Sequence, residues 1–169
     1  MNEILKKART IATIHHRCEE ALSLVDSFLN TNPKDVDALL LKGNILELMA
    51  YHLEVSASTE QFEVNDFKES SRKCYEELLK IAPENPVVYK DLGDYWEDKN
   101  DKKKALEFYD QSIALLKAGK FYSCAKEEIE AAYWAKYELL KDTGNTEKAI
   151  ECLEEGKKLY PESKLLGGV

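Results

Sequence analysis

The stretch from Pro83 to Lys117 constrains the fold of this chain more than any other. Large apolar residues recur there at three- and four-residue spacing on both sides of a polar break at Asp98 to Asp101, which is the spacing of one helix face. Asn85 is a suitable N-cap ahead of Pro86, and either of the last two residues of the break can cap a second helix. The stretch therefore predicts two amphipathic helices joined by a short turn.

The order of residues inside these two helices is distinctive. The first reads Tyr89-x-x-Leu92-Gly93-x-x-Trp96 and the second reads Ala105-x-x-x-Tyr109. The small residues Gly93 and Ala105 would let the two backbones approach closely, while the large residues fill the space around that contact. This pattern resembles the tetratricopeptide repeat (TPR), a helix-turn-helix unit of about 34 residues. The resemblance implies an all-α array of antiparallel helix pairs that serves as a protein-interaction scaffold.

The register extends in both directions and predicts four irregular repeats in one domain over residues 1–169. The expected repeats are 2–35, 36–84, 86–118 and 121–162, followed by a short tail over 163–169. In the first repeat the turn would fall at His15-His16-Arg17, which contains no helix breaker. A helix pair and a single continuous helix over residues 2–29 therefore both stay open.

The second repeat is longer than the family's period. Pro33 and Pro83 lie 50 residues apart, about sixteen more than one repeat. We expect the extra residues between the helices, in a mobile loop with its tip at 56–65 and with Phe62 folded back on the helix pair. The motif Asp66-x-x-Glu69 would then be a capping box that opens the next helix.

The fourth repeat is longer as well. Ala105 and Ala149 lie 44 residues apart, about ten more than the period, which predicts a lengthened helix from about 123 to 142. After Pro161 the chain is too short for the polar capping helix that usually closes such arrays. We therefore expect either an exposed last helix pair that finds a partner or a frayed tail.

Composition and charge limit the expected partners. The chain has 169 residues and a formal net charge of −8, with a pI of about 5.1. Nucleic acids and anionic membranes need a positive surface, so neither is an expected partner. No apolar run is long enough to span a membrane, and the first seven residues lack the apolar block of a signal peptide. We expect a cytoplasmic protein whose partners are proteins or peptides.

No constellation of residues suggests catalysis, a cofactor or a metal site. The sequence has no glycine-rich phosphate loop, no Gly-x-Ser-x-Gly and no His-Glu-x-x-His. The four cysteines are far apart, which predicts reduced thiols packed in helices. One cluster gathers ligand types at helical spacing, and it consists of His15, His16, Cys18, Glu19 and Glu20. Its i,i+4 pairs supply two ligands where a buried zinc site needs three or four, so we expect a noncatalytic protein with an ordinary turn here.

The candidate site is the face formed by the first helix of each repeat. In TPR proteins these helices line a concave groove, and the fifth and ninth positions of each repeat tend to meet the ligand. The resemblance thus implies a set of partner-binding residues, to which the first repeat would contribute Lys6 and Thr10. In the later repeats these positions hold Leu40, Asn44, Lys90, Asp94, Trp134 and Glu138. The set also includes Asp37, Glu47 and Glu97, which should flank them on the same faces one turn away.

Acidic side chains outnumber lysines in this set, and Trp134 offers a large flat anchor. Carboxylates on a partly desolvated wall favour basic partners, so we expect a basic or basic-apolar segment. The carboxylate clamp of the family's co-chaperone branch is not expected. The sequence keeps Lys6 and, in a different register, Asn44, but the clamp's other residues are replaced by Leu41, Val87 and Asp91. Two alternatives to a binding role stay open for these residues, which are ordinary solvation of the carboxylates and internal packing of Trp134. Two alternative functions also stay open: self-association through the C-terminal helix pair, and a regulatory role beside a catalytic partner.

Overall fold

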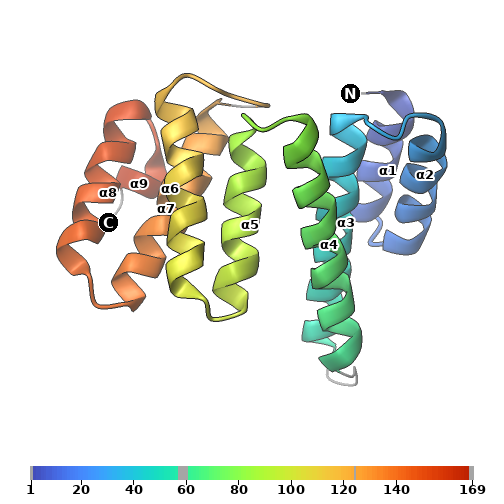
Figure 1. The fold of residues 1–169 in the computed structure, drawn as a ribbon, viewed down its shortest axis with the longest axis horizontal. Coiled ribbons are helices and arrows are strands. Elements are labelled where there is room, and N and C mark those ends of the chain that lie inside the picture. The colour runs from blue at the N-terminus through green and yellow to red at the C-terminus, as the bar shows by residue number, and fades with distance from the viewer. Residues whose placement is uncertain (1, 57–60, 124, 168–169) are drawn as a thin grey trace. The chain divides into compact units, whose positions relative to one another are not determined.

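The structure is a computed structural model that describes residues 2–56, 61–123 and 125–167. The described residues form nine helices and no strand (Figure 1). The chain divides into two compact units, Met1–Pro83 and Glu84–Val169, which we call the N-terminal unit and the C-terminal unit. A single domain over residues 1–169 stays a prediction.

The N-terminal unit contains two helix pairs, α1 (Glu3–Thr13) with α2 (Cys18–Thr31) and α3 (Val36–Val55) with α4 (Gln61–Ile81). The first pair excludes the single continuous helix that the sequence left open. The chain reverses there without glycine or proline because His16 takes a positive φ of 52°, a conformation for which histidine is enriched. The Arg17 amide then donates to the Ile11 carbonyl oxygen at 3.1 Å, which closes the turn.

The core of the N-terminal unit is made by apolar stripes at helical spacing. On α1 the stripe is Leu5, Ala8 and Ala12, all almost fully buried. It packs with α2 and α3 in one cluster whose buried members are Leu5, Ala8, Ile11, Ala12, Cys18, Ala21, Val25, Ala38, Leu41, Ile45 and Met49. α1 also lies against α3, so the first helices of the two pairs are neighbours.

The extra residues of the second repeat lengthen its helices. α3 has 20 residues and α4 has 21, and the predicted loop tip at 56–65 is wrong in extent because α4 already begins at Gln61. The predicted capping box at Asp66 and Glu69 is wrong too, since both residues lie inside α4. Residues 57–60 and the side chain of Phe62 lie outside the described residues, and so does the predicted packing of Phe62.

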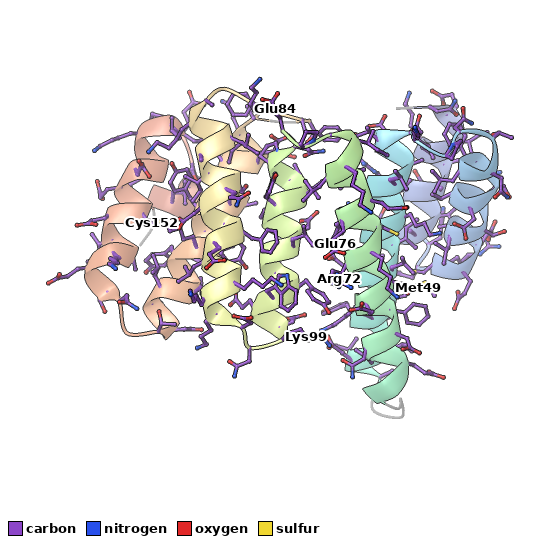
Figure 2. All side chains as sticks on the ribbon, in the orientation of Figure 1. Met49, Arg72, Glu76, Glu84, Lys99 and Cys152 are labelled. Carbon is purple, nitrogen blue, oxygen red and sulfur yellow. The ribbon has the colours of Figure 1, made fainter. Side chains whose placement is uncertain are left out.

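An apolar stripe explains the early start of α4. Val64 is buried, and Phe67 packs against the core of the N-terminal unit. These two residues continue at helical spacing into the buried Ser71, Tyr75 and Leu78. Burial of this stripe outweighs the local capping signal. Farther along α4, the half-buried Arg72 binds Glu69 and also Glu76, whose side chain lies beside it (Figure 2).

The C-terminal unit contains the pairs α5 (Pro86–Asp98) with α6 (Lys102–Lys117) and α7 (Ala125–Asp142) with α8 (Thr146–Leu159), followed by α9 (Lys164–Gly167). The predicted caps are confirmed: the Asn85 side chain accepts from the Val87 amide at 3.1 Å, and the Asp101 side chain accepts from the Lys104 amide at 3.1 Å. α7 matches the lengthened helix expected over 123–142, although it begins at Ala125.

The end of the C-terminal unit is covered by α9. This short helix packs against α7 and α8, and its Leu166 is fully buried. The Ser163 hydroxyl accepts from the Leu166 amide at 3.0 Å. A frayed tail is therefore wrong for residues 163–167, and the last helix pair is covered on this side. Four helical residues are enough because a single large side chain, Leu166, fills the space beside Gly156.

Candidate partner-binding face

In the two middle helix pairs a glycine on the first helix faces a tyrosine ring of the second. A Cβ atom added to Gly43 would lie 2.3 Å from Cε1 of Tyr75, and one added to Gly93 would lie 2.3 Å from Cε1 of Tyr109. Both tyrosines are fully buried. The space at Gly93 is thus filled by the Tyr109 ring, whereas the sequence pattern predicted a close approach of the two backbones at Gly93 and Ala105.

The hydroxyl groups of these tyrosines form hydrogen bonds with residues that the sequence predicted to bind a partner. Tyr75 donates to Oδ1 of Asn44 at 2.8 Å. The Tyr109 hydroxyl lies 2.8 Å from Oδ1 of Asp94 and 2.7 Å from Oε2 of Glu97, but its single hydrogen can serve one carboxylate at a time. Asn44, Asp94 and Glu97 therefore hold the helix pairs together, a role that the sequence pattern did not suggest.

The α7–α8 pair reverses the arrangement. Its glycine, Gly156, lies on the second helix, and a Cβ atom there would lie 2.8 Å from Cγ of Tyr133 on α7. Tyr137 occupies the position that holds glycine in α3 and α5, and it is buried. The sequence pattern did not show that the close contact in this pair joins a glycine on α8 to a ring on α7.

On the N-terminal unit the predicted residues lie along α3. Asn44 is exposed, Asp37 and Glu47 are half-buried, and Leu40 is buried. Their spacing of three or four residues places them on one side of the helix. The neighbouring α1 carries Lys6 and Thr10, both exposed. Lys6 forms an ion pair with Glu3 at 2.6 Å.

On the C-terminal unit the predicted residues come from two helices that lie against each other, α5 and α7. We define the α5–α7 face by the five predicted residues Lys90, Asp94, Glu97, Trp134 and Glu138. Nζ of Lys90 lies 2.6 Å from Oδ2 of Asp94. Oε1 of Glu138 lies 3.8 Å from Nζ of Lys141 on the same helix. The three predicted carboxylates of this face thus outnumber the two lysines that form ion pairs with them.

Further carboxylates make this region more acidic. Burial raises the pKa of Asp91, against the opposing effect of Lys90, to about 6. Burial also raises the pKa of Glu97, against the hydrogen bond from Tyr109 and with support from the charges of Asp94 and Asp142. Because Asp142 belongs to α7, carboxylates from both helices act on one another. An incoming cation would relieve this repulsion.

Trp134 is the one large aromatic residue on the α5–α7 face. It is half-buried and packs against the core cluster of the C-terminal unit. Its ring centroid lies 5.3 Å from that of Tyr137 at an interplanar angle of 42°. The internal packing that the sequence left open is confirmed, and the rest of the ring remains at the surface.

A pocket of about 180 Å³ adjoins the α5–α7 face. It is lined by Lys90 and Asp91 of α5, by Ser112 of α6, and by Glu127 and Glu128 of α7. The Glu128 carboxylate is already engaged, because it accepts from the Tyr122 amide at 2.9 Å. The Ser112 hydroxyl donates to the Pro86 carbonyl oxygen at 2.8 Å. The pocket therefore continues the acidic character of the face.

The thiols in the described part of the chain are poor nucleophiles. Cys18, Cys74 and Cys152 are free, and burial raises the pKa of all three thiols, that of Cys152 to about 11. Cys124 lies outside the described residues. Within the described ranges, no group of three or more His, Cys, Asp or Glu side chains is arranged to hold a metal ion. No described helix is long and apolar enough to cross a membrane.

Neither a protein-family model nor a curated protein matches this sequence. Solved structures do match the fold. TTC0263, a TPR protein of Thermus thermophilus, matches with a TM-score of 0.78 and 14% identity over 98% of this chain and 76% of that chain. A crystal structure of MamA matches with a TM-score of 0.63 and 17% identity over 95% of this chain and 77% of that chain.

A third match is to a chain of the APC/C hetero-tetramer Cut9-Hcn1. Its TM-score is 0.50 and its identity 13%, over 96% of this chain and 34% of that chain. At such identities a structural match establishes the fold and leaves the activity open. The chain has the tetratricopeptide-repeat fold, an all-α arrangement of antiparallel helix pairs.

Proposed function

We propose that this chain is a noncatalytic protein-interaction scaffold that binds a basic or basic-apolar protein segment on its first-helix faces. The observation that carries the proposal is the excess of carboxylates on and beside the α5–α7 face, next to the half-exposed ring of Trp134. Such a surface attracts lysine and arginine side chains and repels acidic ones. A cytoplasmic location belongs to the same proposal.

The TPR fold supports this role, because it presents side chains from successive first helices on rigid elements. The related Cut9-Hcn1 structure is itself a hetero-tetramer. On α3 we assign the corresponding contacts to Asp37, Asn44 and Glu47. Leu40 is buried, so we assign it a supporting role beneath these three side chains.

The raised pKa values of carboxyl groups on and beside the α5–α7 face provide a second way to detect binding. A basic partner would stabilise the charged forms of Asp91 and Glu97, whose pKa values are raised mainly by burial. Binding near pH 6 should therefore release protons from the protein. Calorimetry in two buffers of different ionisation enthalpy measures that release.

The direct test uses two fluorescent peptides of equal length, one alternating arginine with leucine and one alternating glutamate with leucine. Anisotropy should show binding of the basic peptide alone, weaker at high salt because exposed charges are screened. Trp134→Ala should weaken binding by about thirtyfold if the ring is a hot spot of about 2 kcal/mol. Glu138→Lys should weaken it too.

Glu107→Lys is the matched control for Glu138→Lys. Glu107 is exposed on α6, outside the α5–α7 face, and its substitution changes the charge equally. Asp94 and Glu97 are poor test positions because they share the hydrogen bond from Tyr109 and help hold the helix pair. Equal binding of the two peptides, or unchanged binding by both face variants, would refute the proposal.

A second candidate function is self-association through the C-terminal helix pair. Ile150 and Leu159 on α8 and Leu165 on α9 are large apolar side chains that remain exposed. Light scattering over a wide concentration range distinguishes the two functions, since a monomer at every concentration excludes this one. The regulatory alternative uses the same scaffold and differs only in having a catalytic partner.

A further inference from the structure

The extra length of α3 and α4 produces a step in the N-terminal unit. Both helices continue past the α1–α2 turn, as Figure 1 shows. Where they pass the turn, side chains from α2, α3 and α4 enclose a pocket of about 380 Å³, which is within the size range of ligand pockets. The residues that depart from the TPR period thus create this hollow.

The floor of the pocket is apolar. It contains Cys18 and Met49, which are buried, and Leu53 and Phe67, which are half-buried. All four come from helices whose inner sides form the core of the N-terminal unit. A ligand that enters would therefore meet a rigid apolar surface that is already in place.

Two imidazole rings form part of the wall. His16 is placed by the tight α1–α2 turn, and His52 lies on α3. Their ring centroids lie 5.4 Å apart in an edge-to-face arrangement. Nδ1 of His52 lies 3.8 Å from Sγ of Cys18. These groups do not form a metal site among the described residues, but together with Phe67 they offer planar surfaces to a flat ligand group.

Three exposed carboxylates, Glu19, Glu63 and Asp66, line the pocket, and no lysine or arginine among the described residues does. Within the described part of the chain none of the three has an ion-pair partner. Two other pockets contrast with this one, since Lys136 lines a pocket of the C-terminal unit and Lys90 lines the pocket beside the α5–α7 face. The negative charge around this apolar floor is thus uncompensated by the side chains that the structure describes.

We propose that this pocket binds an arginine side chain of a protein partner. A guanidinium group is planar, stacks on aromatic faces and donates in a fork that matches carboxylates. The aliphatic part of the arginine would contact Met49 and Leu53, while its charged end meets Glu63 and Asp66. The proposal rests on the scaffold function proposed above, but it uses a different surface in a different unit.

The test follows the NMR signals of His16 and His52 in the full chain during titration with blocked tripeptides. Ala-Arg-Ala should produce saturable shifts of both residues. The same peptide with citrulline, which keeps the shape and removes the charge, should bind at least about tenfold more weakly. Equal shifts with citrulline, or no shifts with arginine, would overturn the proposal. Lysine binding as tightly as arginine would overturn the choice of arginine.

Variants separate this pocket from the rest of the acidic surface. Glu63→Gln with Asp66→Asn should weaken arginine binding by about tenfold or more. Glu107→Gln with Glu151→Gln removes the same charge from exposed positions outside the pocket and should leave binding unchanged. Glu19→Gln alone supplies a second pocket variant should the double variant lose helix content.

The outcome is distinguishable from failure of the scaffold proposal. If the pocket variants have no effect while Trp134→Ala and Glu138→Lys weaken binding of the basic peptide, the pocket assignment is wrong and the scaffold proposal survives. If arginine shifts His16 and His52 but the α5–α7 variants have no effect, the partner uses the pocket and the α5–α7 assignment is wrong.

Discussion

The helix pairs α3–α4 and α5–α6 share one packing arrangement and differ in the charges that surround it. In both, a tyrosine ring from the second helix occupies the space that a side chain at the glycine position would need. Next to Gly43, however, α3 has the neutral Asn44, whereas α5 has Asp94 next to Gly93. Two residues before each glycine, α3 has a buried leucine and α5 a buried aspartate.

This difference distinguishes the residues that pack the helices together from those that serve another role. The buried ring and the missing Cβ atom are enough to join two helices, as α3–α4 demonstrates with a neutral acceptor. Carboxylates are not required for that purpose, although on α5 Asp94 and Glu97 serve it as acceptors of Tyr109. Asp91 is not an acceptor of Tyr109, and burial raises its pKa to about 6. A group that lowers stability without a packing role is expected at binding surfaces.

The largest expected effect concerns Asp91. Burial raises its pKa from 3.8 to about 6, so the folded state favours the protonated carboxyl. The resulting destabilisation is absent below pH 3.8, grows as pH rises, and is complete above about pH 6. One pKa unit corresponds to about 1.4 kcal/mol, so the destabilisation at pH 7 is about 3 kcal/mol.

Asp91→Asn should therefore raise the free energy of unfolding at pH 7 by about 3 kcal/mol and have little effect at pH 4. Denaturation followed by tryptophan fluorescence measures this directly, because both tryptophans, Trp96 and Trp134, belong to the C-terminal unit. Glu107→Gln, at an exposed position, is the control. An equal gain at both pH values would show that ionisation of Asp91 is not the cause.

The second-largest expected effect tests the glycine–tyrosine contact that the two helix pairs share. Gly43→Ala and Gly93→Ala should each lower the free energy of unfolding by about 1 to 2 kcal/mol. Overpacking against a buried ring costs about 1–3 kcal/mol, and better helix propensity returns up to about 1 kcal/mol. Circular dichroism follows both variants. Gly167→Ala has open space around it and should be neutral; a neutral result at Gly43 or Gly93 would mean that the ring moves freely.

The smallest effect tests how the two pairs differ. Tyr75→Phe removes a hydrogen bond to a neutral amide, while Tyr109→Phe removes the donor shared by two carboxylates. At pH 7 the loss should be about 1 kcal/mol for Tyr75→Phe and larger by about 0.5–1 kcal/mol for Tyr109→Phe. Thermal denaturation at pH 7 and pH 4 measures both. Equal losses at pH 7 would mean that water replaces the hydroxyl at Asp94 and Glu97.

Local signals in the sequence predicted the helix pairs well. The caps at Asn85 and Asp101 and the lengthened α7 depend on spacing and on neighbouring residues, and the structure contains all of them. The start of α4 was missed because the motif at Asp66 and Glu69 is a strong local signal. It is overridden by the burial of Val64 with the rest of the stripe.

The sequence alone determined the all-α class and the pairing of neighbouring helices from residue 36 onward, because these depend on periodicity and on contacts between residues close in the chain. Only the tertiary structure decided which acceptor each tyrosine hydroxyl reaches, that Gly156 on α8 packs against Tyr133 on α7, and that a pocket forms beside the α1–α2 turn. These features join side chains from different helices, so they depend on packing distances that a linear pattern does not contain.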